Sequence, residues 1–156
     1  MTAGSSARTT VTRYVLDTNL WIASGRDAKA KRELRAFVTA RRGRVWMLSV
    51  VAQELAAGAL TPERRRDLEE MLDPFEGQGR VVALSYTAER EVGRAMAALA
   101  ERERFGTTQF TAAFVNDVRI AAACREHGAV LVTRNVGDFA AIQPYLAGFR
   151  FLQPWP

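Results

Sequence analysis

Cysteine, histidine and lysine are nearly absent from this sequence of 156 residues. The one cysteine, Cys124, excludes an internal disulfide and agrees with a reducing cytoplasm, where we expect the protein to reside. The one histidine, His127, stands at a predicted helix end, so a Ser-His-Asp triad is not expected and the residue is interpreted as structural. Lysine occurs only at positions 29 and 31, which argues against a phosphorylatable receiver domain, whose site needs a later lysine.

Long apolar runs and glycine-rich phosphate loops are missing as well. No stretch approaches the roughly 18 apolar residues of a membrane span, so no contact with a membrane is expected. No Gly-x-Gly-x-x-Gly follows the first predicted strand, which excludes a Rossmann cofactor site. Residues 1–12 lack the apolar centre of a signal peptide and are predicted to be a flexible extension. The remaining residues, 13–156, fit one domain.

Positive charge is in modest excess, with a formal net charge of +5 that arginine dominates. A basic surface favours polyanions such as RNA, and the planar arginine side chain suits phosphate. A solvated surface is the other interpretation, because many soluble proteins are mildly basic. On the RNA-binding interpretation, Arg32 and Arg35 of a basic predicted helix and Arg134 after a predicted strand would contact RNA.

Short apolar runs alternate along the chain with longer segments of helical periodicity. This alternation predicts an α/β fold with a mainly parallel sheet that helices cover on both faces. Each of Gly43, Gly79, Gly128 and Gly148 precedes a predicted strand, where a left-handed conformation would complete the connection. The predicted strands are Arg13–Asp17, Arg44–Leu48, Arg80–Leu84, Ala129–Thr133 and Phe149–Leu152, and the predicted helices are Ala28–Arg42, Ser49–Gly58, Pro62 to about Leu72, Ala88–Arg104, Asn116–His127 and a short helix from near Asp138 that stops before Pro144.

Four acidic residues are predicted to lie near one edge of this sheet. Asp17, Glu54 and Asp138 fall at or just after the carboxyl ends of predicted strands, where parallel sheets form their sites. Asp117 is placed in the first turn of its predicted helix, with Asn116 as the N-cap. Converging carboxylates repel one another, and a hard cation such as Mg²⁺ or Mn²⁺, which prefers oxygen ligands, would relieve that repulsion.

Each of these acids also has an ordinary structural interpretation. Asp17 or Asp138 can cap a helix, Glu54 can be a solvated helix carboxylate, and Asp117 can favour a helix N-terminus. Their common placement, rather than any one of them, indicates a catalytic site. A phosphatase of the haloacid-dehalogenase kind would need a second aspartate two residues after Asp17, where this chain has Asn19.

Four segments of the chain, in this order, resemble the PIN domain family and in particular its VapC-type toxin ribonucleases. The segments are Tyr14–Asn19, Ser49–Leu55, Asn116–Ala123 and Leu131–Phe139.

The resemblance implies a three-layer α/β/α fold with a central five-stranded parallel sheet. It also implies an endoribonuclease that depends on Mg²⁺ or Mn²⁺, forms a homodimer and pairs with a small antitoxin protein that plugs the site. It maps the catalytic, metal-binding acids onto Asp17, Glu54, Asp117 and Asp138, and supporting polar positions onto Thr18 and Asn135. Some family members carry an acid where this chain has Asn135. The alternative function is a PIN fold that binds RNA or a protein without cleaving.

Overall fold

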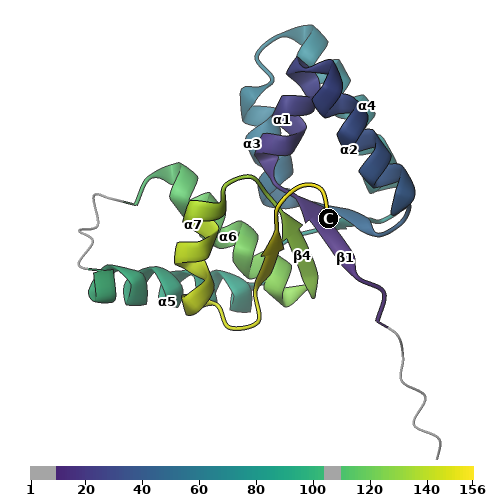
Figure 1. Ribbon diagram of the computed structural model, residues 1–156. Coiled ribbons are helices and arrows are strands. Elements are labelled where there is room, and N and C mark those ends of the chain that lie inside the picture. Colours follow the sequence, from purple (N-terminus) through teal and green to yellow (C-terminus); the bar gives the residue numbers. More distant parts are fainter. Residues whose placement is uncertain (1–9, 104–109) are drawn as a thin grey trace, which may run out of the picture.

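The structure is a computed structural model that describes residues 10–103 and 110–156. The flexible extension predicted for residues 1–12 therefore falls mostly outside the described residues. Helices and strands alternate along the chain (Figure 1). The strands are β1 (Arg13–Leu16), β2 (Val45–Leu48), β3 (Val81–Val82), β4 (Ala129–Val132) and β5 (Arg150–Leu152), and the helices are α1 (Thr18–Arg26), α2 (Ala28–Ala40), α3 (Ser49–Gly58), α4 (Pro62–Gly77), α5 (Tyr86–Glu103), α6 (Ala112–Glu126) and α7 (Val136–Ile142), followed by a 3-10 turn (Gln143–Tyr145).

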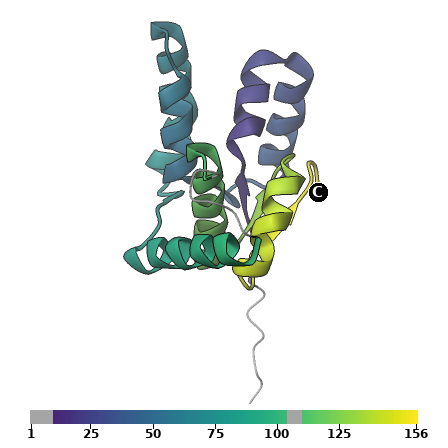
Figure 2. The same ribbon diagram turned by 90° about the vertical axis from the view of Figure 1, so that its left-hand side faces the viewer.

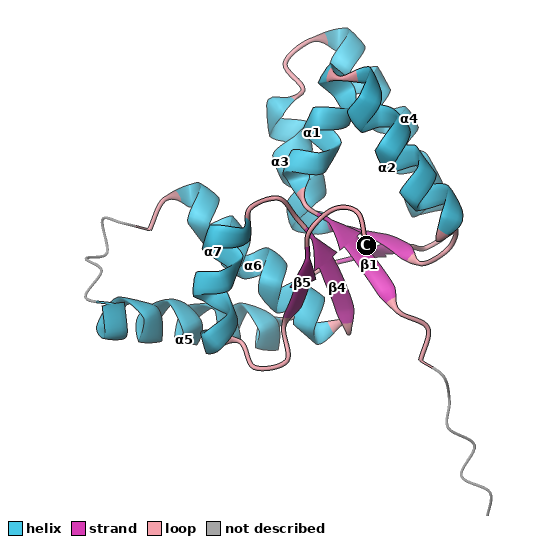
Figure 3. Ribbon diagram, viewed as in Figure 1, coloured by secondary structure: helices cyan, strands magenta, loops and turns pink. Residues whose placement is uncertain are grey.

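The five strands form one parallel sheet in the order β3-β2-β1-β4-β5. From β1 the chain adds β2 and then β3 on one side of the sheet, and it then crosses back to add β4 and β5 on the other side of β1. Right-handed connections on the two sides of such a reversal place their helices on opposite faces of the sheet. Figure 1 shows α1 to α4 at the upper right and α5 to α7 at the lower left, and Figure 3 shows the strands between them. The predicted three-layer α/β/α fold is confirmed.

The helices of the first half form two pairs that rise from the sheet. Figure 2 shows α1 beside α2 on the right and the segment of α3 and α4 on the left, and α1 also packs against α3. The buried Trp21 of α1 meets Phe75 of α4 edge to face, with ring centroids 5.9 Å apart, and this contact links the pairs. Among the described residues, no helix is long and apolar enough to cross a membrane.

The register between β1 and β4 brings the ends of these two strands together. Leu16 pairs with Val132, so the residues that follow them leave the sheet side by side. Both side chains are fully buried, together with Leu131 and Phe139. This apolar core holds the carboxyl edge of the sheet in place, and buried apolar area is the dominant favourable contribution to folding.

The predicted role of the four connecting glycines is confirmed. Their φ angles are +79° at Gly43, +64° at Gly79, +61° at Gly128 and +90° at Gly148. Only glycine adopts this region without steric strain. Each glycine lies in the connection one or two residues before a strand, so the four residues mark where β2 to β5 begin.

Two helices differ from the sequence prediction. The α1 helix was not predicted as a separate element, because its nine residues are too few for a clear apolar period. The α4 helix continues to Gly77 through Pro74, beyond the predicted end near Leu72. Proline removes one backbone hydrogen bond, but the next residue, Phe75, is buried in the core and holds the last turn against the protein.

The α6 helix begins earlier than predicted, and the assignment of Asn116 as its N-cap is wrong. Thr111 caps the helix, and its side-chain oxygen accepts a hydrogen bond from the Phe114 amide at 3.1 Å. A threonine oxygen satisfies one of the amides that a helix start leaves unpaired. Asp117 therefore lies in the second turn of α6, not in the first. The predicted strand Arg80–Leu84 is likewise reduced to Val81–Val82.

Cys124 and His127 have the structural roles predicted for them. The Cys124 side chain is fully buried, and burial raises the pKa of its thiol, with a further contribution from the negative charge of Asp17. The His127 ring lies at the end of α6, with Nε2 3.0 Å from the carbonyl oxygen of Ala83. Neither group is placed to act as a nucleophile or base.

Candidate active site

Asp17 lies where β1 ends and α1 begins, at the centre of the site. Its extended backbone makes it the N-cap of α1, and its Oδ1 accepts a hydrogen bond from the Thr18 amide at 2.8 Å. The residue is only 3% exposed, although a carboxylate loses strong hydration when it is buried. Asp17 is therefore both a helix cap, as the structural interpretation held, and a member of the acidic cluster.

Thr133 supports Asp17 from the neighbouring strand and was missed by the sequence prediction. Its hydroxyl donates to Asp17 Oδ2 at 2.6 Å and accepts from the backbone N–H of Asn135 at 2.9 Å. The two strands involved, β1 and β4, meet where the strand order reverses, which is where open α/β sheets bind their ligands. A threonine directly after the apolar run Ala129–Val132 was the available signal for this role.

Glu54 comes from α3 and is held by side chains of two other helices. The Thr18 hydroxyl of α1 donates to Glu54 Oε2, and the Asn116 amide of α6 donates to Oε1 at 2.9 Å. Thr18 was predicted to support the site, whereas Asn116 was mistaken for a helix cap. With both oxygens engaged, Glu54 has a defined orientation beside Asp17.

Asp117 and Asp138 are joined by a shared amide. The Nδ2 atom of Asn135 donates to Asp117 Oδ2 at 3.2 Å and to Asp138 Oδ2 at 3.0 Å. Asp138 lies in the first turn of α7 and is exposed, while Asp117 is half-buried. Asn135 thus bridges the acids of α6 and α7, at the position where some family members carry a further acid.

The electrostatics of the cluster are those of like charges held together. Burial raises the pKa of Asp17, and hydrogen bonds from Thr133 and Thr18 offset part of this effect. Burial also raises the pKa of Asp117 to about 7, with further contributions from the charges of Asp17, Asp138 and Glu54. The charges of Asp17, Asp138 and Glu54 thus each disfavour the ionised form of Asp117.

The donor set of this cluster fits a hard divalent cation. Its four acids supply only carboxylate oxygens, the ligand type that Mg²⁺ and Mn²⁺ prefer, and their mutual repulsion falls when a cation binds between them. Within residues 10–103 and 110–156, no three His, Cys, Asp or Glu side chains lie close enough together to hold a metal ion as they are arranged. The hydrogen bonds of Thr133 and Asn135 engage three of the carboxylate oxygens instead.

The structure separates the three arginines that were predicted to contact RNA. Arg134 follows Thr133 and lines a pocket beside the acidic cluster. Arg35 lines a different cavity, between α1, α2 and α4, and Arg32 is exposed on α2. Of the three, only Arg134 adjoins the residues that hold the acids.

The comparisons with known proteins agree with this fold. The PIN domain profile matches residues 14–143, and the chain therefore belongs to the PIN domain family. No protein of curated function matches the chain significantly.

Solved structures share the fold at low sequence identity. A chain of DNA-bound VapBC from Salmonella typhimurium is 21% identical, with a TM-score of 0.66 over 92% of this chain and 98% of that chain. VapBC-1 from nontypeable Haemophilus influenzae gives 21% identity and a TM-score of 0.64 over 91% and 98%. A toxin-antitoxin complex from Klebsiella pneumoniae gives 21% identity and a TM-score of 0.58, over 91% of this chain and 98% of that chain. The chain thus spans nearly the full length of these relatives.

Proposed function

We propose that this chain is a Mg²⁺- or Mn²⁺-dependent endoribonuclease and the toxin of a toxin–antitoxin pair. One observation carries the catalytic part of the proposal. Four carboxylates from segments far apart in the sequence converge where the strand order reverses, and four polar side chains hold them there. A fold without a function at this edge would gain no stability from like charges placed so close together.

The acids have distinct roles in this proposal. Asp17 and Asp117 hold the principal metal ion, with Asp138 beside it, and Thr18 and Asn135 support the pocket. A bound Mg²⁺ or Mn²⁺ ion supplies a water of lowered pKa and neutralises charge that develops on the phosphate. The backbone position of Asp17 as a helix cap keeps its carboxylate at the end of β1.

Glu54 serves the attacking water or a second metal ion. Its two oxygens each accept one hydrogen bond, which leaves further lone pairs free to accept a proton or a water. A carboxylate held in this way can orient the water for in-line attack on a phosphodiester. Asn116 acts through Glu54 and is a positioning residue.

Cleavage of structured RNA by the purified protein, with and without metal, tests the proposal. We expect cleavage with Mg²⁺ or Mn²⁺ and none with EDTA. The Asp17→Asn variant keeps the size of the side chain and removes the ligand charge, and it should lower the rate by at least about 10²-fold. Asp73→Asn is the matched control, because Asp73 is exposed on α4 and distant in sequence from the four acids.

Two outcomes would contradict the proposal in different ways. Cleavage by Asp17→Asn at the rate of the wild-type protein would remove the catalytic assignment. Binding of RNA without cleavage under any metal condition would support the alternative, a PIN fold that recognises RNA or a protein without cutting it.

The partners of the protein follow from the same proposal. RNA is the substrate, and Arg134, Arg32 and Arg35 are the side chains proposed to contact it. The resemblance to VapBC and toxin-antitoxin structures supports a small antitoxin protein and a homodimer. The product of a short adjacent reading frame should co-purify with the chain and inhibit RNA cleavage, and size-exclusion chromatography with light scattering should give twice the mass of the chain.

A further inference from the structure

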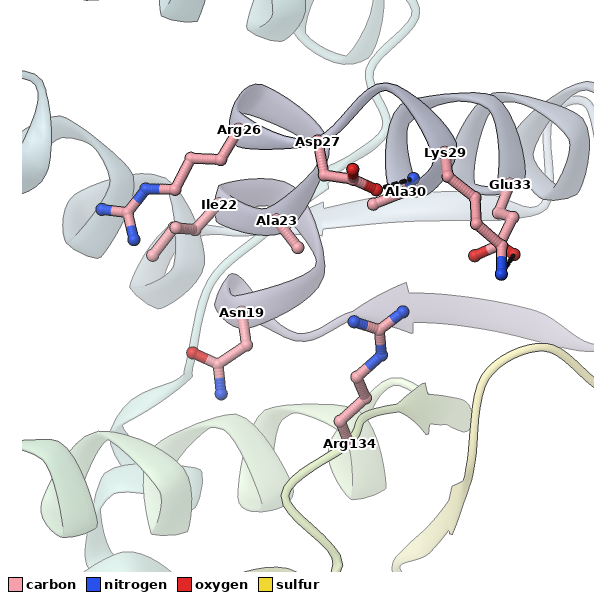
Figure 4. A pocket seen from close by; sticks show the side chains of 9 residues that line it. All are labelled: Asn19, Ile22, Ala23, Arg26, Asp27, Lys29, Ala30, Glu33 and Arg134. Atoms are coloured by element: carbon pink, nitrogen blue, oxygen red, sulfur yellow. Dashed lines mark hydrogen bonds and ion pairs between the residues drawn. The ribbon is translucent and has the colours of Figure 1, made fainter.

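A pocket of about 560 Å³ is lined by residues next in sequence to those that hold the acidic cluster, although none of the four acids lines it. It is formed by α1, the first turns of α2, and the loop after β4. Figure 4 shows Arg134 rising from that loop toward α1, while Asn19 points down from α1 toward the loop. Its size falls in the range of about 300–1,000 Å³ that is typical of ligand sites.

The pocket and the acidic cluster share the same two chain segments. Thr18 holds Glu54, and the next residue, Asn19, lines the pocket. Thr133 and Asn135 hold the acids, and the residue between them, Arg134, points its guanidinium into the pocket (Figure 4). A ligand that extends from the acidic cluster past these segments therefore enters the pocket.

Two of the three positive groups that line the pocket are available for an anion. Among the described residues, the side chains of Arg26 and Arg134 make no hydrogen bond or ion pair, although the Arg134 backbone carbonyl accepts from the Val136 amide. The acidic groups are engaged instead, because Asp27 accepts from the Ala30 amide at 2.7 Å and Glu33 lies 3.9 Å from the Lys29 amine. Figure 4 shows the Arg134 guanidinium pointing into the pocket, where it favours a phosphate group, which an arginine binds with two parallel hydrogen bonds.

The remaining wall suits the other parts of a nucleotide. Ile22 is 37% exposed and lines the pocket together with Ala23. These apolar surfaces can contact a ribose or a base, and the exposed Asn19 amide offers one donor and one acceptor for a polar edge. The pocket thus combines charge for a phosphate with apolar area for a sugar or base.

We propose that this pocket binds the phosphate of an RNA nucleotide that flanks the scissile bond, with Arg134 as its principal ligand. The inference rests on the proposed function and names the part of the substrate that this edge of the site recognises. Binding energy from a flanking nucleotide holds the scissile phosphate in position over the acids, so it acts on substrate affinity and orientation.

Binding of a fluorescent single-stranded RNA in EDTA tests the pocket without requiring cleavage. Loss of one charged contact in Arg134→Gln should weaken binding about tenfold. It should also reduce the slope of log K against log salt by about 0.7. Arg134→Lys, which keeps the charge, should restore part of the affinity, and Arg26→Gln should weaken binding in the same direction.

Arg150→Gln is the matched control for charge. Arg150 is exposed at the start of β5, at the opposite end of the sheet from the acids, and the substitution changes the net charge equally. Its affinity for RNA should stay within twofold of the wild-type value. Equal affinities for Arg134→Gln and Arg150→Gln, or no RNA binding by the wild-type protein, would overturn the inference.

A second measurement separates substrate positioning from a structural role. Arg150→Gln should turn over bis(p-nitrophenyl) phosphate with Mn²⁺ at the wild-type rate. That compound carries one phosphodiester and no flanking phosphate, so Arg134→Gln should lose less activity on it than on RNA. The same variant should lose about tenfold in kcat/KM for RNA, mainly through KM. An equal loss for both substrates would overturn the inference. If no variant cleaves either substrate, the proposed function fails, and the binding measurement still decides whether the pocket binds RNA.

Discussion

Replacing Asp117 by asparagine should stabilise the metal-free protein, and the gain should grow with pH. Burial and three neighbouring carboxylates raise the pKa of Asp117 to about 7 from an ordinary value of 3.8. Asparagine has nearly the same shape, carries no charge and still offers an oxygen to the Asn135 amide, which now donates at 3.2 Å. The substitution thus removes the repulsion while it keeps the packing.

The magnitude follows from the displacement of the pKa. From about pH 4 to pH 7 the unfolded chain has lost the Asp117 proton while the folded protein retains it, so stability falls as the pH rises. The change from 3.8 to about 7 corresponds to roughly 4 kcal/mol as an upper bound, since each pKa unit is worth about 1.4 kcal/mol. This loss of unfolding free energy is complete above about pH 8. The Asp117→Asn variant does not undergo it, because asparagine does not titrate.

Urea denaturation in EDTA, at fixed ionic strength and at several pH values between 4 and 8, measures this difference. The free energies of unfolding of wild type and Asp117→Asn should nearly coincide at pH 4 and separate by up to about 4 kcal/mol at pH 8. Asp73→Asn, at an exposed position of α4, should follow the wild-type curve. Parallel curves for wild type and Asp117→Asn would refute the argument, because the four acids would then not repel one another.

Three further outcomes are expected. Mg²⁺ at 100 times its Kd should stabilise the wild-type protein by about 2.7 kcal/mol and Asp117→Asn by clearly less, measured by urea denaturation at pH 8; equal gains would contradict the assignment of Asp117 as a ligand. Thr133→Val should destabilise by about 1–3 kcal/mol by removing a donor from the buried Asp17, whereas Thr133→Ser should stay near wild type, and equal losses would count against the hydrogen bond. Cys124, fully buried with a raised thiol pKa, should react with Ellman's reagent only after unfolding, and rapid reaction in native buffer would disprove its burial.

The amino-acid sequence alone determined the features that depend on neighbouring residues. Short apolar runs predicted all five strands, and the glycines before four of them adopt the left-handed conformation that those connections need. The α3 helix was predicted with its observed bounds, Ser49–Gly58. Asp17, Glu54 and Asp138 were predicted to lie near one another because the carboxyl ends of parallel strands share one edge, and Asp117 because its helix was predicted to start at that edge. Each of these inferences uses local periodicity or a general rule of parallel sheets.

Only the tertiary structure decided which side chains hold those acids and what lies beside them. Asn116 looked like a helix cap because its contact with Glu54 joins residues 62 positions apart. Thr133 meets Asp17 only because β4 crosses back to pair with β1, and the strand order is absent from the local pattern. The pocket of Arg134 and Asn19 depends on the same pairing. Contacts between distant segments follow from the packing of the whole chain, which gives them no signature in any short stretch of residues.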